Sequence, residues 1–316
     1  MKVAFWDNQL CERGTTVSLF DYAYYNQKLL GNESYIFYDV YAKNNNTCIV
    51  ENFNKHFTVH ATTGFEQVDK YLVEYGIDHI YIIKSGQKDT RLSKVAKNCV
   101  HCVFNCMQPH GEVYSSVSPY VRGNNGRYPV VPHMINIPTH HEHMREHLGI
   151  PSSSIVFGNY AGKKQFDIPY VHEAVYNVAR SNPNIYFIYA NVQKFCEPLP
   201  NIIHLPTIVT RYDKTRFINT CDAMLWGRRT GETFGLAIGE FSSLNKPVIA
   251  TKNTRDQAHV GFLNDKAIWY ESKEELTQIL TKYNREEAMK TNWNAYKDYT
   301  PEKVMKIFNR VYLNEN

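Results

Sequence analysis

Short apolar runs alternate with longer stretches in which apolar residues recur every three or four positions, and this alternation covers most of the chain. The short runs suit strands buried on both faces, whereas the longer spacing predicts helices with one apolar face. In the first half the expected strands are 2–6, 34–38, 56–59, 78–83 and 99–104. The expected helices there are 15–30, with Thr15 or Thr16 as its cap, 64–75 and 92–97. This order predicts a doubly wound α/β domain.

The same alternation resumes after a polar segment, 140–147, which we interpret as an exposed linker helix. The expected strands of the second half are 155–158, 185–190, 202–204, 223–226, 248–250 and 267–270. The expected helices are 166–180, 212–219, 234–244, 273–283, 286–296 and 301–313. We therefore predict two doubly wound α/β domains, residues 1–140 and 141–298, followed by a terminal helix within 299–316.

The stretch 227–250 has the pattern of a turn, a helix and a buried strand, and two carboxylates lie along it, Glu232 and Glu240. Their spacing on a helix places them about 80° apart around the axis and about 12 Å apart along it. Both can therefore border one groove. The free N–H groups of the helix start form a site for phosphate, and a glycine there lets a ligand approach the backbone. These N–H groups belong to Thr233, Phe234 and Gly235.

The string GETFGLAIGEFSSLNKPVI around these glutamates resembles the E-x7-E signature of retaining, nucleotide-sugar-dependent glycosyltransferases of family 4, which have the GT-B fold. The resemblance implies two Rossmann-like domains that face each other across a cleft. Residues 1–140 would form the acceptor side and 141–298 would bind the nucleotide-sugar, while the helix within 299–316 would pack back on the first domain. A solvated helix face with two acids is the alternative explanation of the spacing.

The resemblance also assigns roles to residues of the second domain. Glu240 would hold the ribose hydroxyls and Glu232 would orient the donor sugar. The diphosphate would be held by the N–H groups of 233–235 and by a lysine, Lys163 or Lys164. Family members usually carry an arginine just after the first strand of this domain, and that place is occupied here by Asn159. A lysine cannot replace the bidentate phosphate contact of an arginine.

Two arginines at the mouth of the key helix, Arg228 and Arg229, can compensate for this loss. The alternative for each of these basic residues is a solvated surface charge. In the first domain, Gly14 and Thr15 match the place of the family's N-terminal glycine loop, which faces the donor phosphates or the acceptor. An ordinary strand-to-helix turn is the alternative for that pair.

A histidine in the long loop 105–125 of the first domain, His110, lies in a His-Gly turn that resembles the family's. The resemblance implies that this histidine reaches the sugar or the acceptor. Its chemistry would allow it to donate a hydrogen bond or to handle a proton near neutral pH. A loop histidine that only fixes the turn is the alternative.

Two patterns invite a metal interpretation, and both are disfavoured. Cys99, Cys102 and Cys106 with His101 form part of a zinc pattern, but strand alternation points these side chains to opposite faces. The segment 143–147 matches H-x-x-E-H, although its neighbours are polar all round. The chain contains no Asp-x-Asp, and the fold that it resembles generally stabilises the leaving group without a divalent ion. We therefore expect neither a metal nor a separate cofactor.

Composition narrows the function classes. The net charge of +4 and the scattered basic residues give no case for nucleic acid, and the apolar fraction of 43% suffices for two cores. No apolar run approaches the length of a membrane span, so only peripheral membrane contact is left open. Seven cysteines, an odd number, without a secretory signal predict reduced thiols and a cytoplasmic setting. The oligomeric state is not predicted.

These observations predict a hexosyl- or glycosyltransferase that moves a sugar from a nucleoside-diphosphate-sugar, such as a UDP- or GDP-sugar, to a hydroxyl of a glycan, lipid or protein-linked sugar, with retention. A nucleotide- or glycan-binding protein of the same fold with little or no turnover is the alternative, and Asn159 supports it. A nucleotide-dependent dehydrogenase is disfavoured because the first loop lacks G-x-G-x-x-G.

Overall fold

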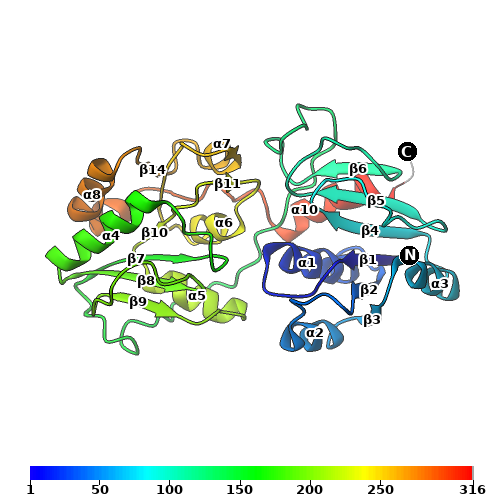
Figure 1. The fold of residues 1–316 in the computed structure, drawn as a ribbon, viewed down its shortest axis with the longest axis horizontal. Helices are drawn as coiled ribbons and strands as arrows, with labels where there is room; N and C mark the ends of the chain where they lie inside the picture. The colour runs from blue at the N-terminus through cyan, green and yellow to red at the C-terminus, as the bar shows by residue number, and fades with distance from the viewer. Residues whose placement is uncertain (315–316) are drawn as a thin grey trace. The chain divides into compact units, whose positions relative to one another are not determined.

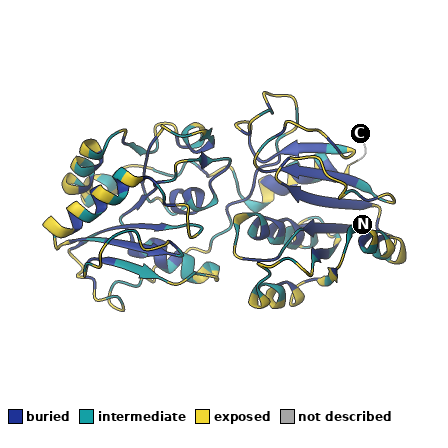
Figure 2. Ribbon diagram, viewed as in Figure 1, coloured by how far each residue is buried: buried dark blue, intermediate teal, exposed yellow. Residues whose placement is uncertain are grey.

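The computed structural model describes residues 1–314, which form two compact α/β units (Figure 1). The first unit consists of Met1–Asn136 together with the segment that begins at Asp298, and the second consists of Ile137–Lys297. In both units the inner strands of the central sheet are buried, the edge strands β3, β9 and β14 are largely half-buried or exposed, and the helices expose one face (Figure 2). Within the described residues, no helix is both long enough and apolar enough to cross a membrane.

The first unit is built on a parallel six-stranded sheet with the order β3-β2-β1-β4-β5-β6. Its strands are β1 (Lys2–Asp7), β2 (Glu33–Asp39), β3 (Thr58–Thr62), β4 (His79–Lys84), β5 (Lys97–Cys102) and β6 (Val113–Ser116). Its helices are α1 (Gly14–Lys28), α2 (Thr47–Asn54), α3 (Phe65–Tyr75) and α10 (Pro301–Phe308), which continues as a π-helical turn (Asn309–Leu313).

Alternate side chains of β1 enter two separate cores because successive residues of a strand point to opposite faces. On one face, Ala4 and Trp6 join a cluster that includes Val68 and Leu72 of α3. On the other face, the ring of Phe5 packs against Tyr81 and the α10 residue Phe308. The terminal helix α10 is therefore an integral part of the first unit's aromatic core.

The second unit repeats the architecture with the parallel order β14-β12-β10-β7-β8-β9. Its strands are β7 (Ile155–Tyr160), β8 (Ile185–Ala190), β9 (Ile202–Leu205), β10 (Ala223–Leu225), β12 (Val248–Ala250) and β14 (Ile268–Trp269), with a small ribbon of β11 (Gly231–Glu232) and β13 (Asp256–Gln257). Its helices are α4 (Pro169–Ser181), α5 (Arg211–Thr220), α6 (Leu236–Ser243), α7 (Ala258–Leu263), α8 (Lys273–Lys282) and α9 (Arg285–Met289). Apolar residues of α4 and α8 cover one face of this sheet.

Two predicted helices are wrong because side chains take over the local hydrogen bonding. The segment 92–97 is not helical: the Ser93 hydroxyl accepts from the N–H groups of Val95 and Ala96, and β5 begins at Lys97. Serine favours such turns over helix interiors. The segment 140–147 is also not helical, since the carbonyls of residues 140 and 142 accept from the side chain of Asn219.

Other differences concern element lengths. The helix expected over 286–296 ends at Met289, because the N–H of Trp293 donates to the side chain of Asn245 instead of continuing the helix. The sequence pattern gave no prediction for α2 and placed β6 inside a loop. The strand expected over 56–59 lies two residues later, as β3.

Candidate functional site

The second unit has a topological switch point between its two central strands, β7 and β10. The chain leads from β7 outward to β8 on one side, and from β10 outward to β12 on the other. Open parallel sheets bind ligands beyond the carboxyl ends of the strands at such a point. The two strands are joined there by Asn159, whose Nδ2 donates to the carbonyl of Leu225 at 2.9 Å. The segments that follow β7 and β10 therefore border the candidate site.

Glu232 lies in the segment that follows β10. The indole Nε1 of Trp226 donates to its Oε1 at 3.2 Å, and Arg228 Nη1 donates to its Oε2 at 3.1 Å. Burial raises the pKa of Glu232 above its ordinary value, and the Arg228 cation and the Trp226 hydrogen bond oppose that effect. The carboxylate is thus placed with two donors on it, and its side chain keeps a 19% exposed fraction through which a ligand can reach it.

The backbone between Glu232 and α6 turns sharply at glycines. Gly235 is the residue before the helix and has a φ of 85°, a conformation that L side chains rarely adopt. The helix begins at Leu236, slightly later than the sequence pattern predicts, so Thr233 and Phe234 belong to the approach to the helix. The carbonyl of Phe234 accepts from the Tyr296 hydroxyl, which anchors this approach. The first N–H groups of α6, which have no partners within the helix, follow Gly235 directly, so the anion site predicted at 233–235 would also include the N–H groups at the start of α6.

Gly231 is the glycine of this segment at which a side chain is least tolerated. It has a φ of 79°, and a Cβ at this position would lie 1.9 Å from the carbonyl oxygen of Asp256 in the paired strand β13. We expect Gly231→Ala to lower the free energy of unfolding by about 2 kcal/mol or more, because strain and a backbone clash add. Urea unfolding measures this. Gly126→Ala is the matched control, since Gly126 also has a positive φ but open space around it; an equal loss in both variants would contradict the clash.

Glu240 lies in α6 and is nearly inaccessible, with a side chain that is 6% exposed. It accepts from the hydroxyl of Tyr160, the last residue of β7, and from the ammonium of Lys214 in the first turns of α5. The Lys214 Nζ atom is 3.0 Å from Oε1 and 3.3 Å from Oε2. Burial and the neighbouring Glu240 raise the pKa of Tyr160, which keeps that phenol protonated as a donor. Three elements thus meet on one carboxylate.

The basic residues predicted to hold a diphosphate occupy different settings. Lys163 and Lys164 are exposed in the loop that follows β7, and the backbone carbonyl of Lys163 accepts from the N–H of Gln193. Arg228 is bound to Glu232, and Arg229 is exposed. The buried Asn159 uses its amide nitrogen within the sheet. The structure therefore brings Arg228 to Glu232 and leaves the two lysines as exposed cations next to β7.

The first unit has its own switch point, between β1 and β4. Asp7 ends β1 there, is 1% exposed and forms an ion pair with Arg13. Burial raises the pKa of Asp7 to about 6, against the effect of Arg13. The prediction that Thr15 or Thr16 caps α1 is wrong: Arg13 is the cap residue, and the Thr16 hydroxyl donates to Asp7 at 3.0 Å. Gly14 opens the helix and is exposed.

His110 lies beside the end of β4 in the same unit. Its Nδ1 is 2.7 Å from the carbonyl of Gln108, and its Nε2 is 3.3 Å from the ammonium of Lys84, which also donates to Asp89 at 2.6 Å. Burial lowers the pKa of His110, and Lys84 adds to that effect. The ring is therefore neutral at pH 7, with both nitrogens engaged. It can contact a sugar only if Lys84 moves away from Nε2.

Sequence reasoning missed Tyr160, Lys214 and Trp226, which donate hydrogen bonds to the two glutamates. These residue types carry no motif, and for Lys214 the contact also depends on which face of α5 meets α6. Trp226 was assigned only to a strand end. Lys84 and Asp7 were missed for a similar reason, although a charged residue at the end of an apolar strand is a usable signal.

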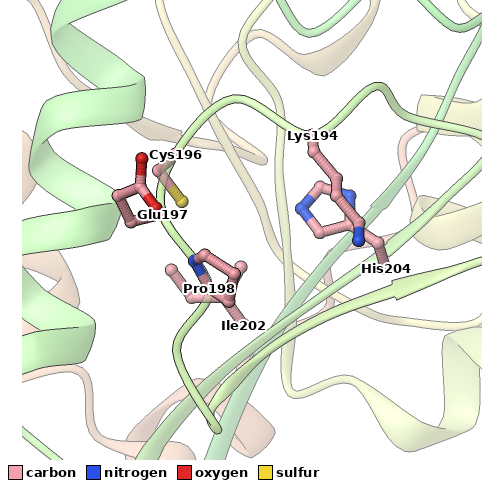
Figure 3. A pocket seen from close by; sticks show the side chains of 6 residues that line it. All are labelled: Lys194, Cys196, Glu197, Pro198, Ile202 and His204. Carbon is pink, nitrogen blue, oxygen red and sulfur yellow. The ribbon is translucent and has the colours of Figure 1, made fainter.

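Neither metal pattern is assembled as a site in the described part of the chain. No group of three or more histidine, cysteine and acidic side chains within residues 1–314 has the proximity to hold a metal ion. All seven cysteines are free. A cavity of about 130 Å³ lies against the connection between β8 and β9 in the second unit, and it contains none of the predicted site residues (Figure 3). It is lined by Lys194, Cys196, Glu197, Pro198, Ile202 and His204.

The fold is shared with solved glycosyltransferases, at low sequence identity. HepE of Anabaena, solved in complex with UDP-glucose, superposes with a TM-score of 0.74 at 14% identity, over 98% of this chain and 99% of that chain. A glycosyltransferase of Rickettsia africae gives 0.72 at 14% identity over 99% of both chains. WaaG, a glycosyltransferase involved in lipopolysaccharide biosynthesis, gives 0.68 at 11% identity, over 99% of this chain and 100% of that chain.

These similarities confirm the predicted fold class, an α/β chain with two Rossmann-like units as in GT-B glycosyltransferases. No protein-family model matches the chain, and no curated protein matches it by sequence.

Proposed function

We propose that this chain is a retaining glycosyltransferase of the family 4 type, which transfers a sugar from a nucleoside-diphosphate-sugar to a hydroxyl acceptor. The observation that carries the proposal is the pair of glutamates at the switch point of the second unit, on either side of the start of α6. Glu232 is exposed enough to be reached, and the α6 N-terminus lies between the two acids. The complex of the similarly folded HepE with UDP-glucose makes UDP-sugars the first donors to test.

The proposed mechanism assigns a separate task to each part of the site. Glu232 accepts a hydrogen bond from a hydroxyl of the donor sugar and fixes its orientation, while Glu240 binds the ribose. Negative charge develops on the diphosphate as the bond to the sugar breaks. The N–H groups at 233–235 and the start of α6, with Lys163 or Lys164, stabilise that charge, so they act mainly on the transition state. This chemistry needs no divalent metal. In the first unit His110, once released from Lys84, would contact the sugar or the acceptor.

A nucleotide- or glycan-binding protein with little turnover is the second candidate. Asn159 favours it, because an amide held on the Leu225 carbonyl supplies neither positive charge nor a bidentate contact to a diphosphate. Donor hydrolysis or transfer separates the two candidates, since both bind nucleotide but only the enzyme releases the nucleoside diphosphate from its sugar.

Nucleotide binding is the first test of the proposal. We expect one of UDP, GDP and ADP to raise the melting temperature of the native protein, and Glu240→Ala to lose that rise. A ligand at a hundredfold excess over its Kd stabilises by about 2.7 kcal/mol, which a thermal-shift assay detects. Release of the same diphosphate from its sugar conjugates is then measured. Absence of any shift in the native protein would overturn the proposed donor site.

A further inference from the structure

The contacts of Glu240 leave it with little capacity to hold a ribose alone. A carboxylate offers about four acceptor positions on its two oxygens. Oε2 already accepts from Tyr160 and Lys214, and Oε1 accepts from Lys214 at 3.0 Å. Two hydroxyls that both donated to this carboxylate would have to displace a protein donor, so Oε1 is the oxygen that can take one more hydrogen bond.

Lys214 supplies a hydrogen-bond donor beside the acceptor oxygen of Glu240. Its ammonium carries three donors and no acceptor, and its side chain is 14% exposed. The ammonium is directed to Glu240 and also lies 5.5 Å from the centre of the Tyr160 ring. Oε1 and Nζ, 3.0 Å apart, thus present one acceptor and one donor side by side. A vicinal diol matches this pair, because one hydroxyl can donate while its neighbour accepts.

We propose that Lys214 and Glu240 recognise the ribose diol of the donor nucleotide together, with one hydroxyl donating to Glu240 Oε1 and the adjacent hydroxyl accepting from Lys214 Nζ. The inference rests on the proposed function and adds Lys214 as a residue that determines specificity for ribonucleotides. A lysine that served only to neutralise Glu240 would make no distinction between the two hydroxyls.

The experiment compares ribose and deoxyribose nucleotides by isothermal titration calorimetry. The probes are UDP, GDP and ADP, and then the 2′-deoxy and 3′-deoxy forms of the one that binds most tightly. The native protein is expected to bind both deoxy forms about tenfold or more weakly than the ribose form, the loss of a hydrogen bond to a charged group. Lys214→Met is expected to lose the discrimination against one deoxy form, and Glu240→Gln against the other.

Three controls separate specificity from folding. Lys214→Arg keeps the cation and is expected to retain the discrimination between ribose and deoxyribose nucleotides. Lys282→Met makes the same lysine-to-methionine change at an exposed position of α8. Thermal melts verify that each variant is folded. If Lys214→Met lost affinity equally for the ribose, 2′-deoxy and 3′-deoxy forms of the nucleotide, the inference would be overturned while the proposed donor site stayed intact. Failure of the native protein to bind any of the three diphosphates would overturn both.

Discussion

Replacing Glu232 by glutamine is expected to lower the rate of the proposed sugar transfer by about a hundredfold or more and to change nucleotide affinity little. The isosteric amide loses the negative charge and cannot accept from both present donors, so its NH₂ group would face either Trp226 or Arg228. Loss of the contact that orients the donor sugar misplaces the reacting atoms, and a misplacement of this kind can cost about 10²-fold in rate. Nucleotide binding is spared because the proposal assigns the ribose to Glu240 of α6, whereas Glu232 lies before the helix.

Steady-state kinetics with the sugar conjugate of the diphosphate that binds best measure this effect. Glu240→Gln is the matched control, since the same substitution there is expected to raise KM and the Kd for nucleotide. A second readout is the acid limb of the dependence of kcat on pH. Burial raises the pKa of Glu232, and Arg228 opposes that rise, so Arg228→Gln is expected to move the acid limb to higher pH. A native kcat in Glu232→Gln would remove Glu232 from the mechanism.

The stretch around these glutamates shows how far the sequence alone reaches. The spacing of apolar residues and the positions of glycine and proline predict a turn, a helix and a buried strand over 227–250. All three are present, with the helix shortened to α6. Gly235 and the proline after α6 act on the backbone locally, so their effects do not depend on distant contacts. The strand-helix alternation likewise predicts the strands of both sheets apart from β6, because burial on two faces leaves a continuous apolar run.

The remaining features depend on contacts between elements that are far apart in the chain. Lys214 reaches Glu240 across 26 positions, and nothing in the local pattern of α5 shows which residue faces α6. The segment 92–97 has helical periodicity but is held by the Ser93 side chain and by Asn98. In both cases a polar side chain with a specific partner decides the outcome, and a pattern of apolar positions does not contain that partner.

Acidification is expected to destabilise the first unit through His101, by about 2 kcal/mol between pH 6.5 and pH 4.5. This β5 residue is fully buried, and its Nδ1 is 2.6 Å from the Tyr81 hydroxyl. Burial lowers its pKa from 6.5 to about 3. Below pH 6.5 the unfolded chain binds a proton that the native state excludes, so the stability falls with pH, with a slope that approaches about 1.4 kcal/mol per unit, until the native state also titrates near pH 3.

Urea unfolding at a series of pH values tests this, with the double variant His101→Phe and Tyr81→Phe as the comparison. Replacing both partners by apolar rings avoids an unpaired buried hydroxyl. Asp7 acts in the opposite sense: its pKa of about 6 lies above the usual 3.8, so the native state binds its proton first and gains stability as pH falls from 6 to 3.8. Asp7 therefore reduces the slope of the free energy of unfolding against pH, but it contributes equally in the unmutated protein and in the double variant. The difference between their curves reports His101 together with its effect on the neighbouring His133, and parallel curves would show that His101 binds its proton as readily in the native state as in the unfolded chain.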